Sequence, residues 1–443
     1  MTADADLAPD RNSETERLND QERYESRNLI IIALQLVIMR TGWIFKTESV
    51  IIPHVLDVIS GNAAWARGFL PVLNRVGQSL PPLLAADTIR DIRLKKRALI
   101  FTTLGMAVPF LVLAAVWWWL EVRQQDWLIW LFLVLYFIFF SATGLNQLVD
   151  GTLQGKLIRP TRRGRLLGIA GAVGSLGAVS AAFFLLRPWI QLPNHDGFVY
   201  IFLFNGSAYS IAGLMANLCH EIPDPEPVAS HAGIPWYSPL IRAWQTVRDD
   251  ARFRRAAAMT TLFMTGLLLF PHYQAMARDV LGSSDTDLIW WVIAQNISVG
   301  LLSPVVGWIA DNYGNRFALR VSAFLAAFTP LIAVLLSEPW FPLGRDWFWI
   351  TYVFLGITPV TMRTITNYTL ELVPRDKHPQ YLSTMTICYT LPFFLSPVLG
   401  VVMDLIPYQV PFLVISGTIA LGGVLTFFMA EPRTSDAVSA ATP

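Results

Sequence analysis

Charged side chains interrupt several long apolar segments of this 443-residue chain, and such groups could bind a solute or an ion. Arg40, Arg75 and Arg363 lie in segments that are otherwise hydrophobic. An arginine or lysine at the centre of a bilayer costs about 2.5–3.5 kcal/mol on insertion scales, so these groups should face the protein interior. The excess of arginine over carboxylate in these segments favours an anionic or polyhydroxylated small substrate.

Other polar residues extend this predicted site across the apolar segments. The predicted substrate-binding residues are Arg40, Glu48, Arg75, Asn146, Asp150, His272, Gln274, Arg363 and Asn367. Each charge also has a structural alternative, which is an ion pair or a long side chain that reaches the membrane interface. On a regular helix Lys46 and Glu48 would point about 200° apart, so at least one of them should face away from the site.

The sequence shows no arrangement typical of an enzyme. The six histidines have no metal-ligand spacing, and no Ser, His and Asp set can be assembled. The glycines between Gly168 and Gly177 lack the strand that a dinucleotide fingerprint requires, and they are more typical of a helix-packing face. We therefore expect no catalysis, no cofactor and no bound metal.

The elements that must position these residues are membrane-spanning helices. Hydrophobic residues make up 54% of the chain and charged residues 15%, against about 25% charged in a soluble domain. A span needs roughly 20 mostly apolar residues. Twelve such spans are expected, at 29–55, 66–87, 98–120, 127–150, 165–187, 197–219, 256–280, 288–310, 317–337, 346–370, 381–404 and 408–430.

The distribution of basic residues predicts the orientation of these spans. Of the 33 Lys and Arg residues, 24 fall in alternate connections and in the two tails, which should be cytoplasmic. We expect a multi-pass protein of the cytoplasmic (inner) membrane with both termini inside. The expected domains are a tail at 1–28, a six-helix bundle at 29–220, a linker at 221–255, a second six-helix bundle at 256–430 and a tail at 431–443. Within the linker, residues 239–255 could form a helix on the membrane surface or a solvated helix.

A short loop after the eighth expected span carries a recognisable motif. It is formed by Gly307, Asp311, Gly314, Arg316 and Arg320. Gly307 would allow a neighbouring helix to approach, Asp311 supplies a carboxylate at a helix end, and Gly314 permits a tight turn. In the first half, Asp87 aligns with Asp311, although Leu83 and Arg90 replace the two glycines. This pattern resembles the signature loop of the major facilitator superfamily.

The resemblance implies an all-α polytopic membrane protein with two pseudo-symmetric six-helix bundles around a central site. It implies a secondary active transporter of a small solute, in which spans one, four, seven and ten line the cavity and the motif acts as a conformational gate. A proton is the default coupling ion for a chain whose apolar segments contain carboxylates and a histidine. The lipid bilayer is the expected surrounding, a nucleic-acid partner is not expected, and a monomer is compatible with this interpretation.

Two other function classes are alternatives to transport. A facilitator-fold protein repurposed as a sensor or assembly factor should lose its cavity charges, which this chain keeps. A membrane-embedded enzyme should show a compact catalytic set, which this chain lacks. Transport is therefore the preferred interpretation.

The predicted topology can be tested with reporter fusions. Fusions at the N-terminus, within residues 221–255 and at the C-terminus should all report from the cytoplasm, because most of the Lys and Arg residues lie in these regions and in loops on the same side. A central connection that reports from the outside while both termini report from the inside would contradict the two-bundle interpretation.

Overall fold

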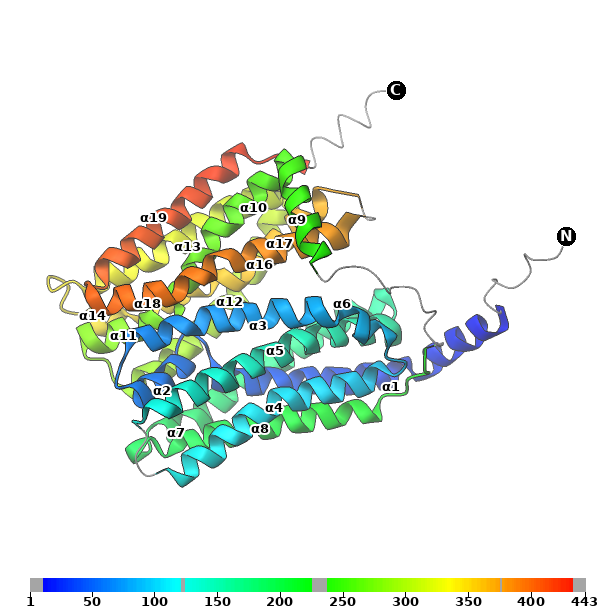
Figure 1. Ribbon diagram of the computed structural model, residues 1–443, viewed down its shortest axis with the longest axis horizontal. Coiled ribbons are helices and arrows are strands. Elements are labelled where there is room, and N and C mark those ends of the chain that lie inside the picture. The colour runs from blue at the N-terminus through cyan, green and yellow to red at the C-terminus, as the bar shows by residue number, and fades with distance from the viewer. Residues whose placement is uncertain (1–10, 121–123, 225–236, 375–376, 433–443) are drawn as a thin grey trace.

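The computed structural model describes residues 11–120, 124–224, 237–374 and 377–432, and all regular elements in these ranges are helices (Figure 1). Both described ends of the chain lie on one side of the molecule, on the right of Figure 1. We call this the terminal side, and we call the opposite side, which carries α2, α7, α11 and α14, the distal side.

The N-terminal half contains six long helical segments, several of which are interrupted. Its elements are α1 (Arg11–Trp43), η1 (Ile44–Lys46), α2 (Ile51–Ser60), α3 (Ala64–Asp91), α4 (Lys95–Trp119), α5 (Asp126–Leu157), α6 (Pro160–Ala181), η2 (Ala182–Leu186), α7 (Arg187–Ile190), η3 (Pro193–His195), α8 (Gly197–Met215) and η4 (Ala216–Leu218).

The C-terminal half repeats this organisation after one additional helix. Its elements are α9 (Ser238–Asp249), α10 (Ala251–Met264), η5 (Thr265–Leu269), α11 (Phe270–Leu281), α12 (Asp285–Tyr313), α13 (Asn315–Ser337), α14 (Gly344–Trp347), α15 (Trp349–Leu355), α16 (Ile357–Glu371), α17 (His378–Thr390), η7 (Leu391–Leu395), α18 (Ser396–Leu405), α19 (Gln409–Leu425) and η8 (Thr426–Phe428).

The membrane character of the chain is confirmed for most of the expected spans. In the described ranges, 10 helical segments are long and apolar enough to cross a membrane. The two remaining expected spans, 66–87 and 256–280, correspond to α3 and to α10 with η5 and α11, which are helical but do not meet both conditions. The all-helical membrane fold is therefore confirmed, and the count of twelve is supported for ten spans.

Local signals explain where several helices begin and end. Asp250 caps α10, because its side chain accepts hydrogen bonds from the backbone N–H groups of Arg252 and Phe253. Ser284 and Asp287 form a capping box at the start of α12. Gly282 ends α11 with a φ of 62°, a left-handed conformation that glycine adopts without strain.

The helix in the linker packs against the C-terminal half. Helix α9 contacts α17 and α10. The side-chain amide of Gln380 donates to Thr246 Oγ1 at 2.7 Å, and the Tyr381 hydroxyl donates to Asp250 Oδ2 at 3.0 Å. The helix expected in residues 239–255 is therefore two helices, α9 and the start of α10, joined at Asp250.

Helices pack mainly within each half, and one contact between the halves is unusually close. Helix α4 packs on α5 and α8, and α13 packs on α16 and α19, whereas α3 packs on α18 from the other half. A Cβ atom added to Gly68 would lie 2.7 Å from the Ser396 carbonyl oxygen, and one added to Gly400 would lie 2.8 Å from the Gly68 Cα atom. The two backbones therefore touch on the distal side with no room for a side chain.

Substitution of these glycines should weaken the contact between the halves. Gly400→Ala should lower the melting temperature of the purified protein, because overpacking of this kind costs about 1–3 kcal/mol. Gly417→Ala in α19 is the matched control, since a Cβ atom there would have no neighbour within 4 Å. Equal melting temperatures for the two variants would show that the close contact is not needed for stability.

Candidate functional site

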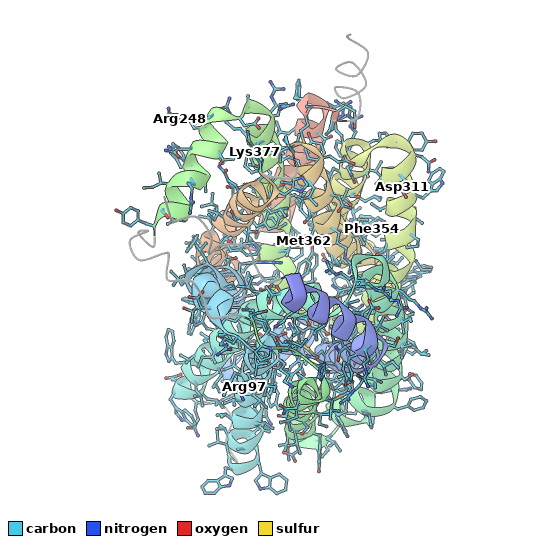
Figure 2. The ribbon with its side chains drawn as sticks, turned by 90° about the vertical axis from the view of Figure 1, so that its right-hand side faces the viewer. Arg97, Arg248, Asp311, Phe354, Met362 and Lys377 are labelled. Atoms are coloured by element: carbon cyan, nitrogen blue, oxygen red, sulfur yellow. The ribbon has the colours of Figure 1, made fainter. Side chains whose placement is uncertain are left out.

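A cavity of about 240 Å³ lies between the two halves of the chain. Its walls come from α1 and the residues that follow it, and from α3, η5, α12 and α16. Four of the predicted binding residues line it: Arg40, Glu48, Arg75 and Arg363. Figure 2 looks onto the terminal side, with Met362 of the cavity wall labelled between the two halves.

The first expected span is not a continuous helix, and the break shapes the cavity wall. Helix α1 ends at Trp43, a 3-10 turn follows, and α2 begins only at Ile51. The expectation that Lys46 and Glu48 point apart is wrong, because it assumed regular helix rotation through the break, although Glu48 lines the cavity and Lys46 does not. The Lys46 ammonium instead donates a hydrogen bond of 2.8 Å to Glu48 Oε1.

Lys46 is fully buried beside aromatic rings. Its Nζ atom lies 3.2 Å from the ring centroid of Trp43, 4.5 Å from that of Phe140 and 5.1 Å from that of Phe139. Cations are attracted to the faces of aromatic rings, and the attraction is stronger where water is excluded. The rings and Glu48 together compensate the loss of hydration of this ammonium group.

Glu48 faces the cavity and is held in place from a second side. Its other carboxylate oxygen accepts a hydrogen bond from the Asn74 side chain, and Gln78 donates to Asn74 Oδ1. Both donors are on α3, one turn apart, so they lie on the same helix face. The carboxylate is therefore fixed between Lys46 on one side and α3 on the other.

The charges around the cavity do not balance. Three guanidinium groups, from Arg40, Arg75 and Arg363, line its walls, while the carboxylate of Glu48 is already paired with Lys46. Arg75 also lies over the Phe393 ring, with its guanidinium carbon 5.2 Å from the ring centroid. The cavity therefore presents an excess of positive charge, which attracts anions.

Amide side chains from α12 complete the cavity, and sequence reasoning missed them. Gln295 and Asn296 line the wall, and the Ser49 hydroxyl donates to Gln295 Oε1 at 2.7 Å across the two halves. The resemblance assigned the cavity to spans one, four, seven and ten, whereas α12 is the eighth. Two adjacent amides within an otherwise apolar segment were the available signal.

Two predicted site residues in the N-terminal half lie outside this cavity. The Asn146 side chain donates to Thr103 Oγ1 at 2.7 Å and so joins α5 to α4. Asp150 accepts a hydrogen bond of 2.7 Å from Gln154 one turn later on α5. Neither residue lines the cavity, so these polar groups contribute to packing within the half.

Three predicted residues of the C-terminal half also lie away from the cavity lining. His272 on α11 is completely buried, and Gln274 donates to Asp57 Oδ2 at 2.6 Å. Asn367 lies one turn beyond Arg363 on α16 and is exposed. The structure therefore brings together only the arginines and Glu48 from the predicted set.

The motif loop joins α12 and α13 and contacts the end of the chain. Gly314 has a φ of 88°, and a Cβ atom there would lie 2.8 Å from Glu431 Oε1. Arg316 pairs with Glu431 at 3.3 Å, and the Arg320 guanidinium lies over the Phe427 ring at 3.7 Å. These contacts explain why glycine and two basic residues occupy these positions.

The structure does not support one expectation for the motif and agrees with another. A Cβ atom on Gly307 would meet nothing within 4 Å, so this glycine is not needed for the approach of a neighbouring helix. Asp311 lies exposed near the end of α12. The side chain of Asp87, its counterpart in the first half, falls outside the described part of the structure.

A buried network of charges joins the halves on the distal side, and sequence reasoning did not identify it. The Asp57 carboxylate of α2 accepts hydrogen bonds from Arg67 on α3 and from Arg278 on α11. Asp57 is only 2% exposed and Arg67 only 1%. The carboxylate of Asp57 in the apolar stretch after Ile51 was the signal, but it fell two residues beyond the first span, which was expected at 29–55.

A second acidic residue links the halves nearby. Asp404 at the end of α18 accepts hydrogen bonds of 2.9 Å from the backbone N–H groups of Ala64 and Trp65. It therefore caps the start of α3 from the other half of the chain, where the helix dipole favours a negative charge. The distal side is thus closed by polar contacts next to the contact between Gly68 and Gly400.

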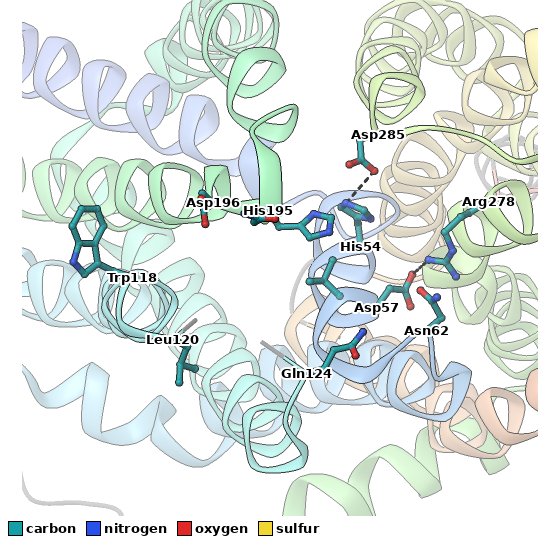
Figure 3. Close-up of a pocket in the computed structure, with 12 residues that line it drawn as sticks. His54, Asp57, Asn62, Trp118, Leu120, Gln124, His195, Asp196, Arg278 and Asp285 are labelled. Carbon is teal, nitrogen blue, oxygen red and sulfur yellow. Dashed lines mark hydrogen bonds and ion pairs between the residues drawn. The ribbon is translucent and has the colours of Figure 1, made fainter. Parts of the chain in front are cut away.

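A large cleft of about 880 Å³ opens beside this network (Figure 3). It is lined from the N-terminal half by His54, Asp57 and His195, and from the C-terminal half by Arg278 and Asp285. Figure 3 shows Asp57 next to Arg278 in this wall, with His54 next to Asp285. The cleft and the central cavity share no lining residue.

Comparison with solved structures identifies the fold. The nucleoside transporter NupG superposes with a TM-score of 0.64 at 13% sequence identity, over 90% of this chain and 98% of that chain. A POT family transporter in complex with thioalcohol conjugated peptide gives a TM-score of 0.67 at 12% identity, over 91% and 95%. A sequence model of the Major Facilitator Superfamily matches residues 273–443. The chain has the fold of the major facilitator superfamily.

Another solved structure is similar in fold. A bacterial homologue of the iron transporter ferroportin in an inward-facing state superposes with a TM-score of 0.64 at 15% identity, over 90% of this chain and 98% of that chain. No curated protein sequence matches the chain. Within this fold, the 240 Å³ cavity lies between the two halves of the chain.

Loss of the distal network should destabilise the protein. Asp57→Asn removes the carboxylate that Arg67 and Arg278 share, and an unpaired buried charge costs about 3–5 kcal/mol. The melting temperature should fall clearly for Asp57→Asn and stay unchanged for the control Asp346→Asn, which alters an exposed carboxylate on α14. An unchanged melting temperature for both variants would contradict the structural importance of the network.

Proposed function

We propose that this protein is a secondary active transporter that binds a small anionic or polyhydroxylated solute between its two halves. The observation that carries the proposal is the cavity lined by Arg40, Arg75 and Arg363, in which positive charge exceeds negative charge. Guanidinium groups form paired hydrogen bonds with carboxylate and phosphate groups, and they also donate to hydroxyl groups. Gln295 and Asn296 of α12 add amide donors and acceptors to the cavity wall.

The transport cycle we propose is a rocking movement of the two halves around this cavity. The distal contacts at Asp57, Asp404 and Gly400 hold the halves together on one side. In the orientation favoured by the basic residues, the distal side faces away from the cytoplasm. The structure then corresponds to a state with its outer side closed.

Proton coupling is proposed through Glu48. Its carboxylate faces the cavity and is held by Lys46 and Asn74. Protonation of Glu48 would remove the charge that stabilises the buried Lys46 ammonium. Binding of a proton to Glu48 would therefore change the position of this lysine. Because Glu48 also faces the solute cavity, it is suited to couple proton binding to solute binding.

A ligand screen followed by substitution of Arg40 tests the proposed site. Purified protein should be stabilised by members of a panel of carboxylates, phosphorylated compounds and sugars in a thermal-shift assay. Arg40→Lys should lower the affinity for the best ligand about tenfold or more, because lysine keeps the charge but loses the planar, paired geometry. Arg40→Ala should abolish binding.

The control is Arg345→Lys on the distal side, which pairs with Asp287 and does not line the cavity. Its ligand affinity should equal that of the unaltered protein. If Arg40→Ala binds the ligand normally but melts at a lower temperature, Arg40 has a structural role and the proposed anion site is wrong.

A further inference from the structure

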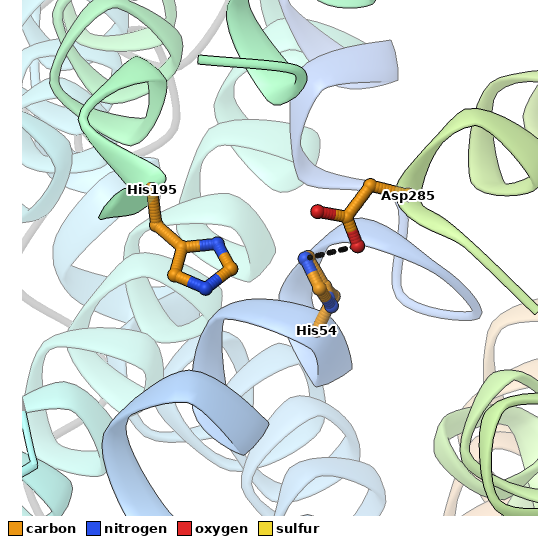
Figure 4. Close-up of side chains that lie close together, drawn as sticks. All are labelled: His54, His195 and Asp285. Carbon is orange, nitrogen blue, oxygen red and sulfur yellow. Dashed lines mark ion pairs between the residues drawn. The ribbon is translucent and has the colours of Figure 1, made fainter. Parts of the chain in front are cut away.

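Three potential metal ligands converge on the distal side, in the wall of the 880 Å³ cleft (Figure 4). His54 comes from α2, His195 from η3 and Asp285 from the first residue of α12. The ligand atoms of the three side chains all lie within 4.8 Å of one another. Figure 4 shows the His195 imidazole projecting toward the pair formed by His54 and Asp285.

We propose that His54, His195 and Asp285 bind a divalent transition-metal ion, with Zn²⁺ as the best match to their chemistry. Two imidazoles and one carboxylate suit zinc and its neighbours in the periodic table, whereas Ca²⁺ and Mg²⁺ prefer sites made only of oxygen atoms. Their wide separation in the chain explains why the sequence gives no metal-binding pattern.

The distances agree with a tetrahedral ion. Two ligands of a tetrahedral zinc with bonds of about 2.0–2.1 Å are separated by about 3.4 Å. The distance from His54 Nε2 to Asp285 Oδ1 is 3.4 Å. His195 lies in a short turn and needs only a small side-chain movement to become the third ligand, because its nitrogen is already within 4.8 Å of the other two atoms. The fourth position would face the cleft and accept water.

An unpartnered atom independently points to a ligand at this place. His54 is only 6% exposed, yet its Nε2 atom makes no hydrogen bond with any described residue. Its 3.4 Å approach to Asp285 counts as an ion pair only when the imidazole is protonated. A buried polar atom without a hydrogen bond costs about 1–3 kcal/mol, and coordination of a metal ion would satisfy it.

The origin of the ligands indicates what the ion would do. His54 and His195 belong to the N-terminal half and Asp285 to the C-terminal half, so one ion would connect the halves beside the pair of Asp57 and Arg278. Such an ion would hold the distal side closed and slow its opening. This inhibitory role rests on the proposed transport function, whereas the binding of the ion does not.

Metal binding is tested with the purified full-length chain and ZnCl₂ by isothermal titration calorimetry. We expect one Zn²⁺ per chain, no heat with MgCl₂, and an absorption spectrum typical of tetrahedral coordination when CoCl₂ replaces ZnCl₂. His54→Gln and His195→Gln should each weaken Zn²⁺ binding about 100-fold or more, since even loss of a residue that only supports a ligand costs 10–100-fold.

The matched control is His378→Gln, which alters a histidine at the start of α17 whose Nε2 lies 3.1 Å from the Val373 carbonyl oxygen. This variant should bind Zn²⁺ like the unaltered protein. Melting temperatures measured without metal verify that each variant is folded. Unchanged Zn²⁺ affinity in a folded His54→Gln, His195→Gln double variant would overturn the site.

The clamping role is measured separately by hydrogen–deuterium exchange. Zn²⁺ should slow exchange in α2, in residues 193–195 and at the start of α12, and this protection of α12 should disappear in Asp285→Asn. Binding of Zn²⁺ with protection confined to the N-terminal half would overturn the clamp. Since neither experiment requires a transported solute, failure of this proposal is distinguishable from failure of the proposed transport function.

Discussion

The cost of burying a charged side chain away from water is the constraint on which this structure depends. The chain satisfies it in two ways. On the distal side, Asp57 lies between Arg67 and Arg278, so the buried charges are neutralised across the two halves. In the centre, Arg40, Arg75 and Arg363 face a cavity. The paired charges therefore connect the two halves on the distal side, and the excess positive charge lies in the central cavity.

The break after Trp43 connects these two arrangements. Because the first span changes direction between α1 and α2, it supplies Glu48 to the central cavity and Asp57 to the distal network. A single segment thus contributes to both the proposed solute site and the contacts that close the distal side. The buried ion pair between Lys46 and Glu48 exists only because the helix is interrupted there.

Insertion cost located the arginines of the cavity from sequence, since few alternatives exist for an arginine near a span centre. Periodicity was less informative for Asn146, because it indicates a polar face but not the neighbour that the face meets, here Thr103 of α4. The predicted opposite orientation of Lys46 and Glu48 was wrong because no local sequence pattern indicated the helix break. The distal network and the cluster of His54, His195 and Asp285 depend on contacts between residues that are distant in the chain. Such contacts cannot be predicted from a single sequence.

The contact between Gly68 and Gly400 differs from the neighbouring ion pairs in the range over which it acts. Dispersion forces decline so steeply that a gap of about 0.5–1 Å removes a quarter to a half of their strength. Opposite charges in a medium of low polarity still attract over several ångströms. As the distal sides of the halves approach, the pair of Asp57 and Arg278 would guide them first, and the glycine backbones would add their attraction only in the last ångström. Closure on this side would therefore be gradual at a distance and abrupt at its end.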